Sequence, residues 1–382
     1  MSARLFLDYN ATAPIRAEVV EAMNQALLEG GNASSIHQEG RKARSLIETA
    51  RQHVCDLVSG DMAGLVFTSG GTEACNLAMQ TKQAPAGDIQ RILISAIEHA
   101  AVLAPAENSG LPIDYIAVQP DGQIDMQALT QLLEDPRPAL VAVMAANNET
   151  GVIQPIAEIG EKVRAHGSVF FCDGVQAAGK IPLHMWRQNI DLLSLSAHKI
   201  GGPAGVGALI AAPHIVPQEL LRGGGQELRR RAGTENLSGI VGFGVAAQAA
   251  AQELTQNASL STQRDEMEKA LRESFPDIVI FGDQAARLPN TSCFALPHKN
   301  AETMVIALDL NGVAVSSGAA CSSGKVSRSH VLDAMQVAPY LSQGAIRCSL
   351  GWQSGARDGE KFVQAFAKIA GEKCPYSRHM VE

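Results

Sequence analysis

The sequence has few aromatic side chains and no block rich in Lys or Arg. Phe, Trp and Tyr make up 4% of the 382 residues while Ala and Gly are plentiful, which favours close packing of helices against a sheet. The formal net charge is −8. Nucleic-acid binding therefore has little electrostatic support, because it depends on clustered basic residues.

Long hydrophobic runs are also missing. The most apolar helical stretch, around Ile240 to Ala251, contains Gly and Gln and is too short to span a bilayer. At the N-terminus an acidic residue, Asp8, comes too early for a signal peptide. We therefore expect a cytoplasmic protein with no membrane partner.

The cysteines lack the spacing of a disulfide framework or a zinc site. There are seven, scattered along the chain, and no two form a CxxC pair. We expect most of them to be buried and inert, and we expect no metal site. Cys321 differs, because only Ser, Ala and Gly surround it. This pattern predicts an exposed loop thiol, which is either a nucleophile or an incidental free cysteine.

Strand and helix patterns alternate through the first two thirds of the chain. Hydrophobic residues make up 46% and charged residues 18%, which indicates an ordered globular protein. Helical patterns separate most of the strand candidates, so the sequence predicts an α/β fold with a mostly parallel seven-stranded sheet covered on both faces. The strand candidates are Gly64–Thr68, Arg91–Ser95, Ile113–Val118, Leu140–Ala145, Val169–Asp173, Leu192–Ser196 and Val206–Ala211.

The pattern changes near Glu235, where a long Ala-rich helical stretch begins. Shorter strands and helices follow it to the end of the chain, including strand candidates at Asn290–Ala295, Val313–Ser316 and Arg347–Leu350. We predict two domains. The large one spans residues 15–253, and residues 1–14 and 254–382 form a smaller α+β domain.

One lysine stands out. The apolar run Asp191-Leu-Leu-Ser-Leu-Ser-Ala-His-Lys199 ends in polar residues, and several glycines follow. A lysine at the exit of a buried strand is costly unless it has a function. A desolvated amine is a nucleophile that forms Schiff bases, so we predict that Lys199 holds a cofactor aldehyde.

Asp173 ends another buried strand and is compatible with that prediction. A carboxylate there can hold a proton on a pyridine nitrogen, with Gln176 close enough to reach the same ligand, although Asp173 is also compatible with a helix cap. The turn Ser69-Gly-Gly-Thr72 opens a helix and fits a phosphate, as many ordinary strand–helix turns would. His99 follows a predicted strand, where a ligand crevice or a simple helix cap is expected.

Three further polar residues lie near predicted element ends. Asn148 belongs to an Asn-rich cluster after the strand candidate Leu140–Ala145, where a plain turn is the alternative to ligand contact. Thr234 precedes the Ala-rich helix and is placed to cap it or to reach a phosphate. Arg347 begins a short strand, where its guanidinium can grip a carboxylate or form a structural ion pair.

Nine motifs along the chain, in their sequence and their order, resemble those of the cysteine desulfurases of the NifS/IscS type, in the class V aminotransferase group of pyridoxal-phosphate enzymes. The resemblance covers nearly the whole chain. It implies a fold type I transferase with pyridoxal 5'-phosphate, and a homodimer that converts L-cysteine to L-alanine and passes sulfur to an acceptor such as an iron–sulfur scaffold protein. The motifs are TSGGTEACN, EHAAV, NNETG, CDGVQ, SAHK, GGGQE, RAGTEN, SSGAACSSG and IRCSLG.

The resemblance also implies a role for each matching residue. Lys199 would bind the cofactor aldehyde and remove the substrate Cα proton, and Cys321 would take the substrate sulfur as a persulfide. His99 would stack on the cofactor ring and handle protons. The other implied contacts are Asp173 to the ring nitrogen, Gln176 to the ring hydroxyl, Gly71, Thr72, Ser196 and His198 to the phosphate, Thr234 to the phosphate of the neighbouring subunit, Asn148 to cofactor and substrate, and Arg347 to the substrate carboxylate.

Other functions stay open at this point. A selenocysteine lyase or another class V transaminase would share most of these motifs, although plain transamination needs no mobile thiol such as Cys321. A nicotinamide oxidoreductase would carry GxGxxG after its first strand, which Ser69-Gly-Gly-Thr72 does not match. A binding module without catalysis would leave Lys199 and Cys321 unexplained. The chain departs from the family at Gly201 and Ala204, where Tyr and Lys are commoner.

Overall fold

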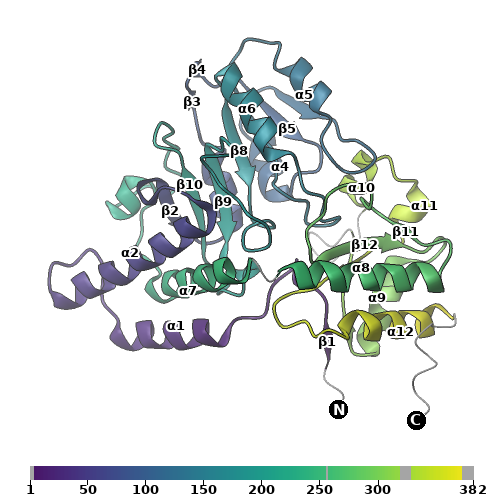
Figure 1. Ribbon diagram of the computed structural model, residues 1–382. Coiled ribbons are helices and arrows are strands. Elements are labelled where there is room, and N and C mark those ends of the chain that lie inside the picture. The colour runs from purple at the N-terminus through teal and green to yellow at the C-terminus, as the bar shows by residue number, and fades with distance from the viewer. Residues whose placement is uncertain (1–3, 255–256, 319–327, 372–382) are drawn as a thin grey trace.

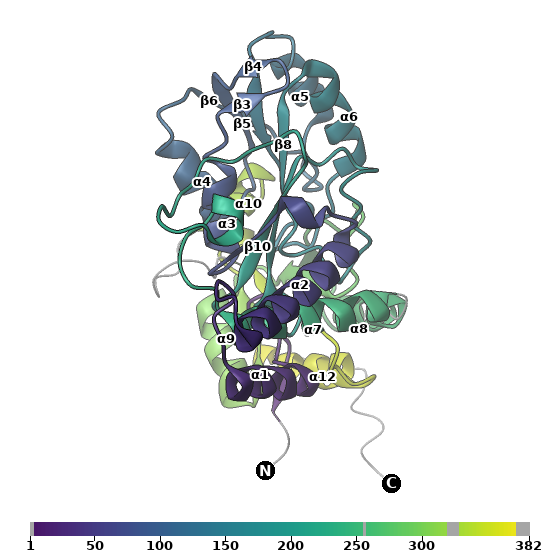
Figure 2. The ribbon, with the colours of Figure 1, turned by 90° about the vertical axis from the view of Figure 1, so that its left-hand side faces the viewer.

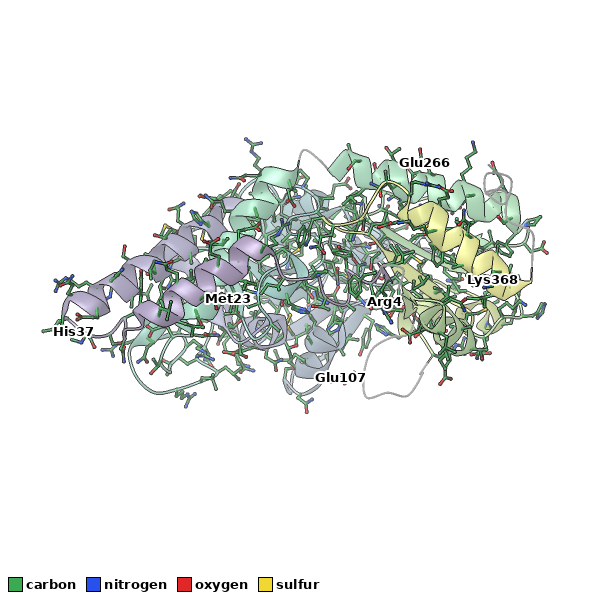
Figure 3. All side chains as sticks on the ribbon, turned by 90° about the horizontal axis from the view of Figure 1, so that it is seen from below. Arg4, Met23, His37, Glu107, Glu266 and Lys368 are labelled. Carbon is green, nitrogen blue, oxygen red and sulfur yellow. The ribbon has the colours of Figure 1, made fainter. Side chains whose placement is uncertain are left out.

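Residues 4–254, 257–318 and 328–371 are described by the computed structural model (Figure 1). They form two units, each with its own sheet and apolar core. Seen from below, His37 lies at one end of the molecule, and Glu266 and Lys368 lie at the other (Figure 3). The two units therefore lie side by side along the long dimension of the molecule.

The larger unit is built on the predicted seven-stranded sheet, with strand order β2-β10-β9-β8-β7-β5-β6. Only β10 runs antiparallel to its neighbours. The loop from β9 to β10 is short, and a short connection is sufficient only between antiparallel strands. The strands are β2 (Leu65–Thr68), β5 (Arg91–Ser95), β6 (Ile113–Ile116), β7 (Ala139–Ala142), β8 (Val169–Asp173), β9 (Leu192–Ser196) and β10 (Gly207–Ala211).

Helices cover both faces of this sheet, as Figure 2 shows with α3 and α4 on one side and α2 and α6 on the other. Every strand except the edge strand β6 is buried along its whole length, which explains why these strands are almost continuously apolar. The predicted fold class is thereby confirmed. The helices of this unit are α1 (Ala17–Glu29), α2 (Gln38–Val58), α3 (Gly71–Ala78), α4 (Ala100–Glu107), α5 (Met126–Leu132), α6 (Ile156–His166) and α7 (Leu237–Glu253).

Small residues let α2 and α7 approach each other closely. A Cβ atom added at Gly244 of α7 would lie 2.5 Å from the Cα atom of Ala50 in α2. The space between the two helices therefore admits no side chain at this point, which accounts for the Ala- and Gly-rich sequence of α7.

The smaller unit contains a four-stranded antiparallel sheet of order β11-β12-β15-β14. Its core gathers four of the ten phenylalanines, at positions 275, 294, 362 and 366, with ring centroids 5.2–5.9 Å apart. The elements are β11 (Val279–Ile280), β12 (Thr291–Ala295), β14 (Ser316–Ser317), β15 (Ile346–Ser349), α8 (Asn257–Ser274), α9 (Ala301–Leu310), α10 (His330–Ala334), α11 (Pro339–Ser342) and α12 (Asp358–Ala370).

The start of the chain packs with this smaller unit. Leu5 and Leu7 belong to its apolar core, and β1 (Leu5–Phe6) pairs in parallel with β13 (Val313–Ala314). The single strand predicted at Val313–Ser316 is therefore wrong. The segment contains two short strands, because β13 pairs with β1 while β14 pairs with β15.

Two further findings complete the fold. The hairpin of β3 (Gln83–Ala84) and β4 (Gly87–Asp88) was not predicted, and neither was α11. Among the described residues, no helix is both long enough and apolar enough to cross a membrane.

Candidate active site

A cavity of about 270 Å³ lies where the two units meet, and most of the predicted site residues line it. Nine of these come from the large unit and one, Arg347, from the small unit. This is the arrangement expected of a site formed at a domain interface. The predicted residues in the cavity wall are Gly71, Thr72, His99, Asn148, Asp173, Gln176, Ser196, His198, Lys199 and Arg347.

The strands bring these residues together. Asp173 is the last residue of β8, Ser196 is the last residue of β9, and His99 follows β5. Carboxyl ends of parallel strands meet at one edge of a sheet, and ligands bind in the crevice there. Side chains that are far apart in the sequence are thus close together in the fold.

Lys199 ends a short 3₁₀ turn directly after β9. Its Nζ donates hydrogen bonds to the backbone carbonyl oxygens of Asn10 at 2.7 Å and Ala11 at 2.8 Å. These contacts hold the amine at the cavity wall. Burial and the nearby Lys199 charge lower the pKa of the neighbouring His198 to about 4, so His198 is neutral near pH 7.

His99 caps a helix and also lines the cavity, so the two positions that the sequence offered as alternatives, a helix cap and a crevice wall, are both occupied by this residue. Its Nδ1 accepts a hydrogen bond from the backbone N–H of Ala101 at 3.1 Å, at the start of α4. Burial lowers the pKa of His99. A neutral ring whose Nδ1 is an acceptor carries its proton on Nε2.

Asp173 presents an organised carboxylate at the cavity. Its Oδ1 accepts hydrogen bonds from the Ser194 hydroxyl and the Val175 backbone N–H, both at 3.0 Å. The other carboxylate oxygen, Oδ2, accepts neither of these two hydrogen bonds. The charge of Asp173 contributes to raising the pKa values of Glu98 and Cys75, although burial is the larger cause for both. A cationic ring nitrogen would complement this carboxylate.

The first turn of α3 forms an anion cradle. A Cβ atom at Gly71 would lie 3.1 Å from Val175 Cγ2 and 3.3 Å from Ser196 Cβ, so a side chain here would crowd the wall. The helix start supplies backbone N–H groups and positive potential. Hydroxyl and imidazole groups of Thr72, Ser196 and His198 line the same cavity.

Arg347 is buried with one donor unpaired. Its guanidinium donates to Asp8 Oδ1 at 2.8 Å and to the carbonyl oxygen of Asn148 at 3.0 Å. Its Nε is buried and has no hydrogen-bond partner among the described residues. Arg347 also lines the cavity, and its two hydrogen bonds use only two of the five guanidinium donors. A cationic side chain with donors to spare at the cavity wall suits a carboxylate.

Comparisons with known proteins agree with this geometry. The class-V aminotransferase model matches residues 5–362. A cysteine desulfurase of Cereibacter sphaeroides is 40% identical over 375 residues, which are 97% of this chain and 96% of that protein. The cysteine desulfurase IscS of Dictyoglomus turgidum is 39% identical over 94% of this chain and 92% of that protein. The chain belongs to the cysteine desulfurases of the class-V aminotransferase family.

Solved structures give the same family. A NifS-like protein from Rickettsia africae superposes with a TM-score of 0.88 at 34% identity, covering 96% of this chain and 99% of that one. Enzymes of this family depend on pyridoxal phosphate. The residues present fit that group, because one cavity holds an amine, a carboxylate and an anion cradle.

Two predicted site residues are not in the described cavity. Cys321 lies outside the described residues. Thr234 is exposed and does not line the cavity of its own chain. The alternative that Thr234 caps α7 is wrong, because the Asn236 side chain takes that position and accepts from the Gly239 backbone N–H at 3.2 Å.

The five cysteines that the structure describes are unsuited to nucleophilic attack. All five are buried. Burial raises the pKa of each thiol, to about 12 for Cys55, so none of them forms a thiolate near neutral pH. The expectation that most cysteines are buried and inert is confirmed.

Asn10 is a residue of the site that the sequence does not identify, because the segment Asn10-Ala-Thr-Ala-Pro14 predicts only a turn. It is 1% exposed, and its backbone oxygen accepts from Lys199 and from Gln176 Nε2. Its side chain donates to Thr291 Oγ1 at 2.9 Å and to the Asn148 carbonyl at 3.3 Å. The local sequence contains no signal for this role, because the burial of Asn10 and its distant hydrogen-bond partners exist only in the fold.

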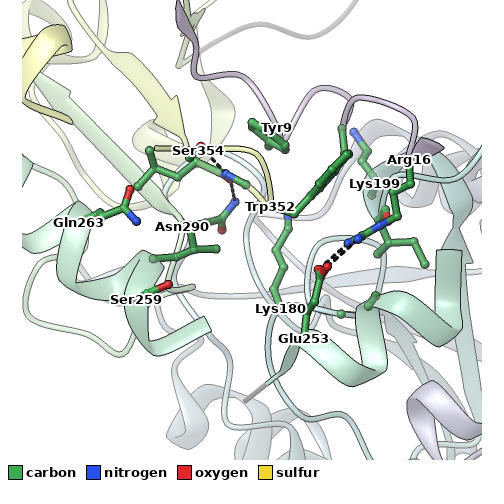
Figure 4. Close-up of a pocket in the computed structure, with 17 residues that line it drawn as sticks. Tyr9, Arg16, Lys180, Lys199, Glu253, Ser259, Gln263, Asn290, Trp352 and Ser354 are labelled. Carbon is green, nitrogen blue, oxygen red and sulfur yellow. Dashed lines mark hydrogen bonds and ion pairs between the residues drawn. The ribbon is translucent and has the colours of Figure 1, made fainter. Parts of the chain in front are cut away.

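A smaller cavity of about 150 Å³ also borders Lys199 and is lined by residues of both units (Figure 4). Arg16 forms a two-bond ion pair with Glu253 there, at 2.7 and 2.6 Å, and its guanidinium lies 4.8 Å from the Trp352 ring centre. A Cβ atom at Gly201 would lie 2.8 Å from Arg16 Cγ. Arg16 therefore fills the space beside Gly201, and no side chain fits at position 201.

Proposed function

We propose that this chain removes sulfur from L-cysteine with pyridoxal phosphate, releases L-alanine, and carries the sulfur on Cys321 as a persulfide. The observation that supports this most is the cavity that collects an amine, a carboxylate, an anion cradle and a buried guanidinium around Lys199. The family membership given above agrees with it.

In this proposal, the large unit holds the cofactor. Lys199 binds its aldehyde carbon, Asp173 its ring nitrogen, Gln176 its ring hydroxyl, and His99 lies against its ring. Gly71, Thr72, Ser196 and His198 hold its phosphate, and Asn148 contacts both cofactor and substrate. When bound, the cofactor supplies an electron sink for the negative charge that forms at the substrate Cα.

The chain's own residues move the protons. The Lys199 amine, held by two backbone carbonyls, accepts the Cα proton of the substrate. His99 carries its proton on Nε2 because Nδ1 is an acceptor, so Nε2 is the atom that gives a proton during turnover.

Arg347 orients the substrate. The two contacts to Asp8 and Asn148 fix the guanidinium plane, and the N–H groups of its terminal nitrogens that these contacts do not use are left for the substrate carboxylate. This arrangement selects an α-amino acid with its side chain directed away from Arg347.

Cys321 makes the sulfur transfer. Its thiolate attacks the substrate sulfur, a sulfur–sulfur bond forms, and the bond between that sulfur and Cβ breaks. The described strand just before this segment, β14, is paired with β15, and Ser316 is the register partner of Arg347.

We further propose a cytoplasmic homodimer. Several large apolar side chains are exposed, with Leu28 and Ile36 each at 90% and Leu228 at 68%. Such exposed groups favour a protein partner, and a second copy would also bring Thr234 to the phosphate of its neighbour. We propose the domain division 15–253 against 1–14 with 254–382, L-cysteine as substrate, and an iron–sulfur scaffold as sulfur acceptor.

The test compares purified wild type with Lys199→Ala and Cys321→Ala. Wild type is expected to absorb visible light through its bound cofactor and to release sulfide and alanine from L-cysteine. Lys199→Ala is expected to lose the normal absorbance, and Cys321→Ala to keep it but stop releasing sulfide. Full sulfide release by Cys321→Ala would refute the persulfide role. A parallel assay with L-selenocysteine separates desulfurase from lyase activity.

A further inference from the structure

Lys180 is a lysine for which neither the sequence reasoning nor the mechanism provides a role. It lies four residues after Gln176 and borders the smaller cavity beside Lys199 (Figure 4). Its Nζ donates to Gln176 Oε1 at 2.8 Å and to Asn10 Oδ1 at 3.1 Å. Desolvation, with the charges of Lys199 and Arg347, lowers the pKa of Lys180 well below its usual value. A lysine kept in this place at such a cost is expected to have a function.

The two hydrogen bonds decide how two side-chain amides are turned. The oxygen and nitrogen ends of an amide have nearly the same shape, so only the hydrogen-bond partners select one orientation. Lys180 has N–H groups for both contacts, even as a neutral amine, and these select the oxygen ends of Gln176 and Asn10. The Gln176 NH2 group must therefore point the other way.

That NH2 group has one hydrogen to spare. Nε2 of Gln176 donates to the Asn10 backbone oxygen at 2.9 Å, which uses one of its two hydrogens. Gln176 also lines the larger cavity. The second hydrogen is thus left for a ligand in that cavity. With the amide turned over, an oxygen would face the ligand instead, and the Asn10 carbonyl would lose its donor.

We propose that Lys180 is a positioning residue, which turns the Gln176 amide so that its NH2 group donates to the ring oxygen of bound pyridoxal phosphate. This inference rests on the proposed contact between Gln176 and that ring oxygen. Lys180 also donates to Asn10 Oδ1, as does Asn290 Nδ2 at 3.2 Å, and together they turn Asn10 Nδ2 toward the Asn148 carbonyl and Thr291. A side chain outside the proposed cofactor contacts thus helps to orient two amides beside the site.

The test is a double-mutant cycle of Lys180→Met and Gln176→Met in the full chain. Two quantities are measured with pyridoxal phosphate, its dissociation constant and the pH midpoint of its visible absorbance. Each single variant is expected to weaken binding about 3- to 10-fold, as for one lost hydrogen bond, and to shift the midpoint in the same direction. The double variant is expected to bind within about twofold of Gln176→Met, because Lys180 acts through Gln176.

Two variants keep the proposal testable if Lys180→Met does not fold. Gln176→Glu retains an acceptor for Lys180 but replaces the NH2 group with an oxygen, and it is expected to bind at least as weakly as Gln176→Met. Lys180→Gln retains an N–H donor and is expected to keep the wild-type midpoint. Lys162→Met, on the remote helix α6, is the control and is expected to change neither quantity.

The inference is overturned by wild-type values for Lys180→Met or Gln176→Glu, or by single effects that multiply in the double variant. These results differ from a failure of the proposed function. If the wild type has no visible absorbance that depends on Lys199, the cofactor site itself is wrong, and the inference falls with it.

Discussion

Arg347 combines two properties that the sequence presented as alternatives. It forms a buried ion pair with Asp8 and also lines the cavity. The ion pair fixes the guanidinium plane. A structural contact is thus compatible with the proposed contact to substrate, because a guanidinium has five donors.

We predict that Arg347→Lys weakens substrate binding more than it weakens folding. Lysine keeps the positive charge but loses the planar donor set, so the KM for L-cysteine is expected to rise about 10- to 100-fold, as for a lost charged hydrogen bond of about 1.5–3 kcal/mol. Steady-state kinetics and a thermal melt check this. Arg357→Lys, in an exposed pair with Glu360, is the control. Equal KM values for the two variants would contradict the assignment.

Glu149 is a second residue with a measurable consequence. Its side chain is buried, and the hydroxyl of Ser329 donates a hydrogen bond to Glu149 Oε2 at 2.5 Å. Burial raises the pKa of Glu149 to about 7, although Ser329 and Arg347 oppose the shift. Between pH 4.5 and 7 the folded chain therefore binds a proton at this site that the unfolded chain has lost.

This difference predicts that Glu149 makes folding less stable as pH rises from 4.5 to 7. Since one pKa unit is 1.36 kcal/mol, the loss is on the order of 2–3 kcal/mol. Glu149→Gln has no carboxyl proton to lose, so its free energy of unfolding should not show this loss. The difference in this free energy between the variant and wild type should therefore shift in favour of the variant from pH 5 to pH 8. Urea unfolding at both values measures this. Glu158→Gln, at an exposed position of α6, should follow wild type. Parallel pH curves for wild type and Glu149→Gln would exclude the effect.

At the scale of elements, the contact between α2 and α7 depends on a missing side chain. Gly244→Val would place atoms within 2.5 Å of the Ala50 backbone, and backbone atoms cannot move aside as a flexible side chain can. We predict a loss of about 1–3 kcal/mol or more in the free energy of unfolding. Gln248→Val, at an exposed position of the same helix, creates the same residue without the clash and should cost less than about 1 kcal/mol. Similar losses for both would mean that helix propensity, not close approach, is responsible.

Elements with strong local patterns were predictable from the sequence. The strands Arg91–Ser95, Val169–Asp173 and Leu192–Ser196 have the predicted bounds. The apolar pattern of these segments is typical of buried elements, so the local sequence is sufficient to predict them. The split between β13 and β14 could not be predicted, because it depends on two partners, β1 and β15, from opposite ends of the chain.

The site shows the same division. Its strand-end residues Asp173, Ser196 and Lys199 were predictable, since polar groups that end apolar runs are visible in one sequence. Asn10 and Lys180 were not, because their importance comes from hydrogen bonds to residues more than 150 positions away for Asn10, and from the orientation of an amide for Lys180. The segment Gly223-Gly-Gly-Gln-Glu227 predicts a flexible loop, yet the Glu227 carboxylate is buried against Arg51 at 3.1 Å.

At the scale of the whole molecule, the site exists only where the two units meet. Leu5 and Leu7 fix the start of the chain in the small unit, and Asn10, three residues later, contacts Lys199 in the large unit. Arg347 comes from the small unit and donates to Asn148 of the large unit. Any change in the relative placement of the units would therefore alter the cofactor and substrate contacts together.

The proposed dimer extends this dependence to a second chain and gives the last prediction. If Thr234 holds the phosphate of its neighbour, Thr234→Ala should weaken pyridoxal phosphate binding about 3- to 10-fold, as for one lost hydrogen bond. A mixed dimer of one Thr234→Ala chain and one Lys199→Ala chain should then regain one site of wild-type affinity. That site has Lys199 from the first chain and Thr234 from the second. Differently tagged chains, purified as mixed dimers and titrated with the cofactor, provide the measurement. If Thr234 instead acted within its own chain, the one site that retains Lys199 would still lack Thr234, and the mixed dimer would bind as weakly as Thr234→Ala alone.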